Sequence, residues 1–181
     1  MFSHIYRSPI GDIVIHSDGE SVTSLRFLDV TESSDGSIDR NLPIFDAAAS
    51  WLDRYFSGTD PGPTPPIRTD STPFRETVWH ILKDIPYGQT VSYGRVAVIA
   101  AEMMGKDRMS AQAIGNAVGS NPVAIMIPCH RVIGSDGSLT GYAGGIDRKA
   151  FLLSLEMKST VGTSPKGRRT HTQAGAPATK Y

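Results

Sequence analysis

A proline-rich segment separates two parts of this sequence that differ in character. Residues 57–71, SGTDPGPTPPIRTDS, hold four prolines and two glycines. Proline lacks a backbone donor and glycine has wide conformational freedom, so a helix or strand does not run through such a stretch. We therefore predict a boundary here, with an N-terminal domain over residues 1–70 that includes this linker and a second domain over residues 71–157.

The N-terminal part has the patterns of a small strand-and-helix domain. Short apolar runs are separated by turn signals at Pro9–Gly11 and Asp18–Gly19, which predicts three strands. These strands cover residues 4–8, 13–17 and 22–27. A helix is predicted over residues 46–56, because apolar side chains recur there at helical spacing, at Ala48, Trp51, Leu52 and Tyr55.

The second part carries the signals of short helices with tight joints. Thr72 followed by Pro73 suits the start of a first helix, and Ser92 suits the cap of a second. Ser110 suits the cap of a third helix over residues 111–119.

A glycine-rich stretch follows these helices. Residues 132–134 and 138–140 flank a turn at Asp136–Gly137, which predicts a β-hairpin. A last helix is predicted over residues 147–157. Helices followed by such a hairpin are typical of a winged helix-turn-helix, so we expect an α+β protein.

Charge is distributed unevenly along the chain. The net charges of residues 1–70, 71–157 and 158–181 are −6, +1 and +5, although the whole chain is neutral. This asymmetry favours a negatively charged polymer against the C-terminal part. Residues 158–181 have few large apolar side chains, and we expect a basic, disordered tail there.

Composition excludes several classes of site. The single cysteine, Cys129, cannot form an internal disulfide, and the five histidines show no zinc-binding spacing. We therefore expect no bound metal. No stretch approaches 18 apolar residues, so we expect no membrane span either. A soluble, cytoplasmic protein is the default reading.

Cys129 lies in the stretch IMIPCHRVIG, between a proline and a His–Arg pair. A lone cysteine is usually a small buried hydrophobic residue. His130 and Arg131 also allow a reactive thiolate, although adjacent side chains in extended chain point apart. The residues alone leave both readings open.

Five stretches, in order along the chain, carry a resemblance to a known family. They are Pro86–Tyr93 (PYGQTVSY), Ala113–Pro122 (AIGNAVGSNP), Ile127–Val132 (IPCHRV), Gly141–Gly145 (GYAGG) and Arg148–Glu156 (RKAFLLSLE). The sequence resembles the O6-alkylguanine-DNA alkyltransferases, also called methylated-DNA–protein-cysteine methyltransferases, over most of residues 73–157. Ser8–Gly11 (SPIG) is a weaker match to the family's N-terminal domain.

The resemblance implies a ribonuclease H-like N-terminal domain and a winged helix-turn-helix alkyltransferase domain. It implies direct-reversal DNA repair, in which a methyl or larger alkyl group moves irreversibly from O6 of guanine, or O4 of thymine, to Cys129 after base flipping. Each molecule acts once, as a monomer on double-stranded DNA containing O6-alkylguanine, without a cofactor or an obligate protein partner.

The same resemblance implies roles for single residues. Cys129 is the nucleophile, His130 deprotonates it through a water, and Glu156 holds the imidazole. Tyr93 gives a proton or hydrogen bond to the departing base, and Asn121 fixes the turn that carries the cysteine. The implied substrate pocket consists of Val132, Tyr142, Ala143 and Gly144. The implied DNA contacts are Ser92, Gln112, Ala113 and Arg131. As a separate hypothesis, we expect Lys106 and Arg108, with Arg75 or Arg95, to make part of the phosphate contact.

Two features depart from the best-known members of the family. Gln112 stands where they carry an arginine that fills the space left by the flipped base. The connection before that helix, residues 101–109, is longer and brings Lys106 and Arg108 near the helix start. The small side chains of residues 111–119 also suit plain helix packing, which is the alternative to a DNA-reading helix.

Other readings compete with the implied roles. Glu156 also fits an ordinary solvated helix position, Tyr93 a packing residue, and Tyr142 a residue that only braces the hairpin. As a whole, the protein could instead be a non-catalytic sensor of alkylated bases, a cysteine hydrolase, or a regulator that senses its own alkylation. The presence of Cys129, its adjacency to His130, and the lack of further cysteines argue against these three in turn.

Overall fold

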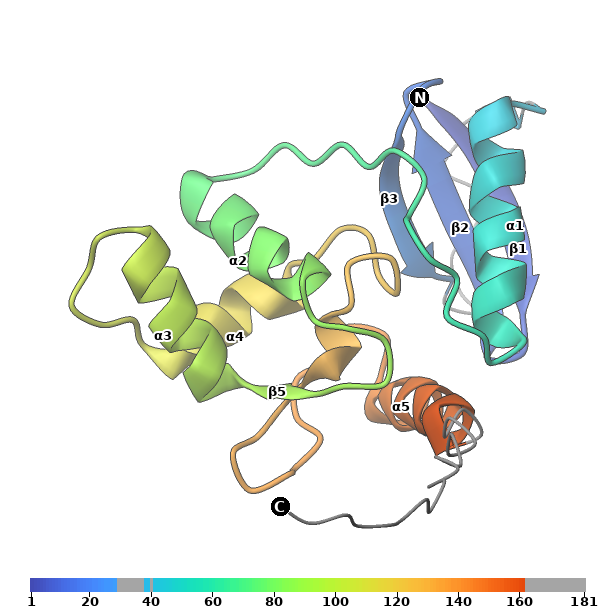
Figure 1. Cartoon of the computed structure of the whole chain (residues 1–181). Helices are drawn as coiled ribbons and strands as arrows, with labels where there is room; N and C mark the ends of the chain where they lie inside the picture. Colours follow the sequence, from blue (N-terminus) through green and yellow to red (C-terminus); the bar gives the residue numbers. More distant parts are fainter. Residues whose placement is uncertain (29–37, 40, 162–181) are drawn as a thin grey trace, which may run out of the picture.

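The structure is a computed structural model that describes residues 1–28, 38–39 and 41–161. A β-sheet covered by one helix forms the N-terminal part, and the remaining helices form the C-terminal part beside it (Figure 1). This arrangement confirms the expected α+β class.

The sheet has four strands in the order β3-β2-β1-β4. β1 (Phe2–Ser8), β2 (Gly11–Ser17) and β3 (Val22–Phe27) are antiparallel neighbours, and β4 (Ile38–Asp39) adds a short parallel edge beside β1. The three expected strands are present; β1 and β2 each begin two residues earlier than predicted.

Helix α1 (Pro43–Phe56) covers one face of this sheet (Figure 1). It begins earlier than the predicted residue 46, because Pro43 takes the first-turn position where a missing N–H costs nothing. The extra turn buries Ile44 and Phe45 beside the predicted stripe of Ala48, Trp51, Leu52 and Tyr55.

The outer edge of β3 is paired with two segments from elsewhere in the chain. Val22 bonds through its N–H to Pro66 O at 2.8 Å and accepts from Arg68 N at 3.0 Å. Farther along, Leu25 donates to Pro122 O and accepts from Ala124 N, both at 2.9 Å. The linker and the segment before the cysteine therefore complete the sheet edge.

Three helices follow the linker: α2 (Pro73–Lys83), α3 (Tyr93–Met103) and α4 (Ala111–Gly119). Their predicted caps are confirmed, since the side chains of Thr72, Ser92 and Ser110 each accept a first-turn N–H. Trp79 of α2 donates its indole N–H to Ala117 O at 2.8 Å and so joins α2 to α4.

The β-hairpin predicted from residues 132–134 and 138–140 is wrong. β6 (Val132–Ile133) pairs in parallel with β5 (Val91–Ser92), and within the described residues no strand follows over 138–140. A turn is closed by Gly134 N–H on Ser138 O at 2.8 Å. The carbonyl of Thr140 accepts instead from two side chains, Tyr93 Oη and Lys149 Nζ, so it is not available for a strand ladder.

Helix α5 (Ile146–Val161) closes the described chain and is longer than the predicted 147–157. The predicted tail therefore begins inside this helix, and residues 162–181 lie outside the described residues. None of the helices in the described ranges is long and apolar enough to cross a membrane.

Candidate active site

Cys129 is held at the end of a tightly bonded loop. After Pro122–Ala124 has paired with β3, Ile125 reverses the chain with φ of 67°. That conformation is unfavourable for a β-branched residue by roughly 1–2 kcal/mol, and here it is maintained by burial of the side chain at 1% exposure. Cys129 then begins a single turn of 3-10 helix, η1 (Cys129–Arg131).

Asn121 ties the two ends of this loop together. Its Oδ1 accepts from Val123 N at 3.0 Å, and its Nδ2 donates to Ile127 O at 2.8 Å and to Cys129 Sγ at 3.0 Å. The expectation that this asparagine fixes the turn fits these contacts. The donor on sulfur also stabilises a thiolate relative to a thiol.

The sulfur lies in a buried setting. Burial raises the pKa of the Cys129 thiol, while the hydrogen bond from Asn121 and the positive charge of Lys149 act in the opposite direction. Lys149 is itself fully buried, where it donates to Val132 O at 2.6 Å and Thr140 O at 2.8 Å. The site thus restrains the thiol from general reactivity and provides a fixed cation for its anion.

Glu156 is the centre of a buried hydrogen-bond cluster. Its Oε1 lies 2.7 Å from His130 Nε2 and accepts from Tyr55 Oη at 2.7 Å. Its Oε2 accepts from Arg131 Nε at 3.0 Å and from Gly88 N at 2.9 Å. Burial raises the pKa of Glu156, but the hydrogen bonds of His130 and Arg131, the charge of Arg131 and the charge that His130 carries once protonated outweigh it and lower the pKa to about 2. Glu156 is therefore a carboxylate, not a solvated helix residue.

His130 is fully buried next to this carboxylate. Burial lowers the pKa of the imidazole, and the neighbouring Glu156 only partly offsets that shift. Because Nε2 faces a carboxylate oxygen, the hydrogen-bond network assigns the proton to Nε2. Nδ1 is buried and has no hydrogen-bond partner among the described residues, so it presents a bare lone pair.

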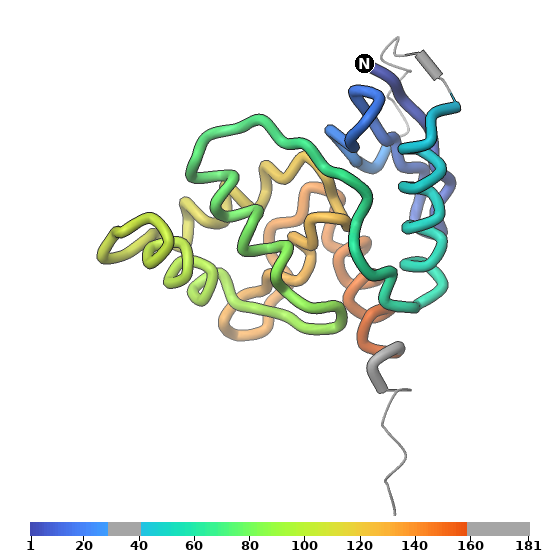
Figure 2. Tube along the Cα trace, turned by 45° about the horizontal axis from the view of Figure 1, so that its top comes forward, coloured from blue at the N-terminus to red at the C-terminus, as the bar shows by residue number. Residues whose placement is uncertain are grey.

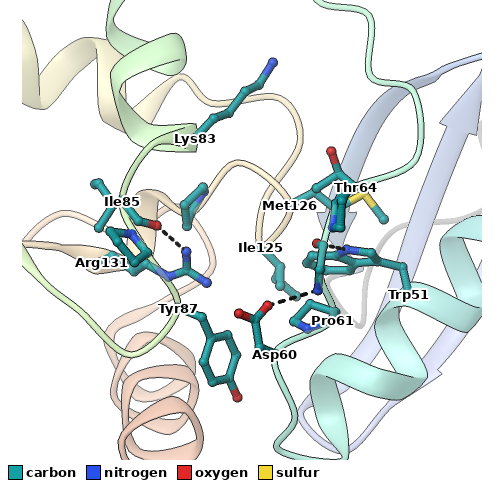
Figure 3. A pocket seen from close by; sticks show the side chains of 14 residues that line it. Trp51, Asp60, Pro61, Thr64, Lys83, Ile85, Tyr87, Ile125, Met126 and Arg131 are labelled. Atoms are coloured by element: carbon teal, nitrogen blue, oxygen red, sulfur yellow. Dashed lines mark hydrogen bonds between the residues drawn. The ribbon is translucent and has the colours of Figure 1, made fainter. Parts of the chain in front are cut away.

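Arg131 does not lie where a DNA contact requires it. Its Nη1 donates to Ile85 O at 2.6 Å and its Nη2 to Glu156 Oε1 at 3.0 Å, and only 7% of the residue is exposed. Figure 3 shows the guanidinium at the wall of a cavity of about 370 Å³ between the linker and the end of α2. Pro128 also lines this cavity, and Cys129 is not among its lining residues. Because buried partners take up its guanidinium, the expected DNA contact of Arg131 is withdrawn.

The implied pocket residues differ in exposure. Val132 and Tyr142 are buried, and Ala143 is exposed. Burial raises the pKa of the Tyr142 phenol, and the electrostatic influence of Cys129 adds to that shift. The Tyr142 hydroxyl is buried without a hydrogen-bond partner in the described part of the chain.

The pocket loop is fastened to the N-terminal sheet. Arg148 donates from Nη1 to Gly144 O and from Nε to Ile10 O, both at 3.0 Å, and lies over the Phe27 ring at 4.5 Å. Gly144 has no room for a side chain, because a Cβ there would come within 2.6 Å of the Tyr142 ring and 2.9 Å of Phe27.

Tyr93 has a different partner from the one its implied role requires. Its hydroxyl donates to Thr140 O at 2.8 Å, and burial raises the pKa of the phenol. The phenol is therefore protonated. To donate to a substrate, its hydroxyl has to give up the hydrogen bond to Thr140 O.

Both halves of the chain match known domains. Residues 73–158 match the DNA binding domain of 6-O-methylguanine DNA methyltransferase, and residues 1–63 match its ribonuclease-like domain. The chain belongs to this family.

Similar proteins span nearly the whole chain. The methylated-DNA–protein-cysteine methyltransferase of Haemophilus influenzae is 36% identical over 89% of this chain and 92% of its own. The methyltransferase of the same name from Methanosarcina barkeri is 42% identical, and the match covers 86% of this chain and 97% of that protein. The Mycobacterium tuberculosis OGT in complex with DNA shares 39% identity and a TM-score of 0.76, covering 88% of this chain and 94% of its own.

The implied DNA contacts of this family member gather around α3 and α4. Ser92 caps α3, and Ala113 supplies the N–H that Ser110 accepts at 3.1 Å. The remaining candidates, Lys106, Arg108 and Gln112, are exposed. Lys106 and Arg108 line one groove of about 280 Å³ between α3 and the start of α4. Figure 2 shows this connection at the end of the molecule away from the sheet.

Sequence reasoning missed three residues of the site. Tyr55 was read only as part of an apolar stripe, and periodicity carries no sign that its hydroxyl meets Glu156. Lys149 and Arg148 stood inside a motif without a role, although a lysine on the buried face of a helix is unusual enough to have drawn attention.

Proposed function

We propose that this protein repairs DNA by moving an alkyl group, most often methyl, from O6 of guanine to Cys129. Family membership supports the reaction type. The single observation that carries the assignment of the acceptor is the Asn121–Cys129 contact at 3.0 Å, inside a loop fixed by the sheet. A thiol in this setting is positioned for one partner and shielded from others.

The step is an in-line displacement. The Cys129 thiolate attacks the alkyl carbon, a carbon–sulfur bond forms, and the carbon–O6 bond breaks with its electron pair on the base. The proton lost by the thiol is balanced by one taken up by the guanine. The resulting thioether has no leaving group that the site activates, so each molecule acts once and no cofactor enters.

His130 takes the part of the base in this scheme. Its bare Nδ1 accepts the thiol proton through a bridging water, while Nε2 stays bonded to Glu156. The carboxylate orients the ring and stabilises the imidazolium that forms. Lys149 and Asn121 stabilise the sulfur anion at the same moment.

The pocket accepts the extruded base beside Tyr142. The Tyr142 hydroxyl needs a partner that the described protein does not supply, and a ring atom of the base provides one. Ala143 offers its backbone N–H at the pocket mouth, and Val132 and Gly144 form the apolar walls. Tyr93 turns from Thr140 O to the departing base. O4-alkylthymine fits the same chemistry.

DNA is held by α4 and the groove before it. A base inside a duplex is out of reach of a buried thiol, so it is flipped, at a cost of a few kcal/mol. Gln112 fills the vacated space, and the α4 N-terminus with Ser92, Ala113, Lys106 and Arg108 contacts the backbone. We further propose that the protein acts as a cytoplasmic monomer built from domains 1–70 and 71–157.

Intact mass separates this function from its rivals. After incubation with a duplex that holds one O6-methylguanine, the protein gains the mass of one methylene on the peptide with Cys129, and Cys129→Ser gains none. A sensor of alkylated bases shifts the duplex in a gel with its own mass unchanged. A hydrolase releases product repeatedly. Either of these two results replaces the proposal.

A further inference from the structure

Tyr55 brings the N-terminal part of the chain into direct contact with the charged centre of the site. Tyr55 lies in the last turn of α1 and is fully buried. Its ring stacks on the Trp51 ring, with the two ring centroids 5.6 Å apart. Its hydroxyl donates to Glu156 Oε1 at 2.7 Å and lies 3.2 Å from His130 Nε2.

The proton positions around this hydroxyl follow from its contacts. Burial and the nearby Glu156 raise the pKa of Tyr55 far above its ordinary value, so the phenol keeps its one proton. The hydroxyl donates this proton in the shorter of its two contacts, the one to Glu156 Oε1. The phenol oxygen then has only lone pairs to offer His130 Nε2. Nε2 therefore faces two acceptors, the Tyr55 oxygen and Glu156 Oε1. The proton of the imidazole is held on Nε2 by both.

A phenylalanine would fill the same apolar space with no polar group to satisfy. A buried hydroxyl costs free energy unless it is bonded, and a bond to a charged group is stronger than average. The hydroxyl also draws charge from the carboxylate that stabilises the imidazolium. Its removal therefore makes Glu156 a stronger partner for protonated His130, and this gain outweighs the loss of the longer, 3.2 Å contact between the phenol oxygen and Nε2.

We propose that Tyr55 is a positioning residue of the alkyl-transfer site, which keeps His130 neutral with its lone pair on Nδ1. The inference rests on the proposed function of Cys129 and His130. It gives the N-terminal domain a part in the chemistry besides supporting the fold.

Other charged and titratable groups act on His130 from each element packed around it. Glu156 of α5 raises the pKa of the imidazole, and Arg131 and Lys149 lower it. Tyr87, from the segment after α2, faces Tyr55 edge-on with ring centroids 5.9 Å apart. All of these stay in place when only the Tyr55 hydroxyl is removed, so a change in His130 reports on that hydroxyl.

The test compares Tyr55→Phe with the unchanged protein and with Tyr6→Phe. Tyr6 is a matched control, since its hydroxyl also donates to a carboxylate, Asp53 Oδ1 at 2.8 Å, in an exposed bond outside the Glu156 cluster. Nitrogen-15 NMR of the histidine rings gives the tautomer and pKa of His130, with His130→Gln to assign the signal. Single-turnover methyl transfer is followed across the same pH range.

We expect Tyr55→Phe to raise the pKa of His130 and to move the acid limb of the transfer rate to higher pH, with a roughly tenfold lower rate near neutral pH. Tyr6→Phe leaves both curves in place. An unchanged His130 pKa, or a rate lowered equally at every pH, overturns the proposal. If no variant transfers methyl, the proposed function fails, and the NMR titration still decides the part of Tyr55.

Site-specific 3-fluorotyrosine at position 55 covers the case in which Tyr55→Phe does not fold. Fluorine makes the phenol a stronger donor, so the pKa of His130 shifts downward, opposite to the deletion. The same label at position 6 leaves the pKa of His130 unchanged. A shift of the wrong sign contradicts the inference.

Discussion

The amide of Asn121 lies 3.0 Å from the sulfur of Cys129 and 2.8 Å from the carbonyl of Ile127. One side chain thus holds the backbone of the reactive loop and contacts the reactive atom. No second side chain in the described loop has both contacts, so the geometry of the loop and the state of the thiol change together.

Asn121→Ala is expected to slow transfer and weaken the fold at once. Loss of the bond to sulfur raises the pKa of the thiol, and loss of the two loop bonds leaves backbone groups unsatisfied. We expect a fall of about 10- to 100-fold in the single-turnover rate, with a stability loss of about 1–3 kcal/mol. Quenched single-turnover assays measure the transfer rate, and urea unfolding measures the stability. Ser120→Ala, which removes only a bond to Ala117 O, is the neighbouring control.

Glu156→Gln is expected to be among the most damaging substitutions. It leaves the Arg131 guanidinium buried beside a neutral amide, which costs about 3–5 kcal/mol. Urea unfolding of Glu156→Gln, of Arg131→Met and of Arg131→Met/Glu156→Gln tests this. The double variant should recover part of the loss, because it removes the unpaired charge; a double variant as weak as the sum of both single changes contradicts the account.

Acid is expected to destabilise the protein in two steps. Burial holds the pKa of His130 below the ordinary 6.5, so the unfolded state takes up this proton first and stability falls as the pH drops below 6.5. Glu156 has a pKa of about 2 in place of 4.5, so its contribution is present above 4.5 and is lost between 4.5 and 2. The second step amounts to about 3 kcal/mol.

Urea unfolding midpoints at a series of pH values measure both steps. His130→Gln should lose the upper step and reduce the lower one, because His130 is one of the groups that lower the pKa of Glu156. A stability curve for His130→Gln that still falls between neutral pH and the lower step shows that another group is responsible.

The groove residues are expected to act through phosphate contacts. Lys106→Ala/Arg108→Ala should weaken binding to any duplex and reduce the salt slope of the affinity by about 2, whereas Gln112→Arg should raise that slope by about 1. Fluorescence anisotropy at several salt concentrations gives the slopes. Lys83→Ala, an exposed cation at the end of α2, serves as the control. Equal salt slopes for the unchanged protein and these three variants would rule out phosphate contacts in the groove.

Arg148→Met is expected to loosen the pocket loop. It removes the bonds to Gly144 O and Ile10 O, so Tyr142 and Ala143 are less well placed and transfer slows by several-fold, on the order of 3–10 times. Affinity for undamaged duplex should stay the same. Arg68→Met is the control, because its ion pair with Asp18 is mostly exposed.

Local signals in the sequence predicted much of the structure. The three caps at Thr72, Ser92 and Ser110 need only a side chain and the N–H three residues on, and all three are present. The strands β1 to β3 follow from alternation and turn residues. The family resemblance assigned Cys129, His130 and Glu156 to one site, which their spacing in the sequence does not reveal.

Long-range contacts were beyond such reasoning. The pairing of Leu25 with Pro122 and Ala124 has no local sign, and neither has the meeting of Tyr55 with Glu156. The hairpin was mispredicted because the acceptor on Thr140 is taken by Tyr93 and Lys149 rather than by a strand. Arg131 was assigned to DNA because sequence shows its charge and not its buried partner.

The closure of the β3 edge bears on how the protein is made. The peptide groups of Leu25 leave the ribosome early, but their partners in Pro122 and Ala124 are synthesised much later. Until then this stretch of edge strand lacks its native bonds, a condition that favours pairing with other nascent chains. Val22 is protected sooner, by Pro66 and Arg68 of the linker. Chaperone demand during synthesis should therefore fall sharply once the cysteine loop emerges.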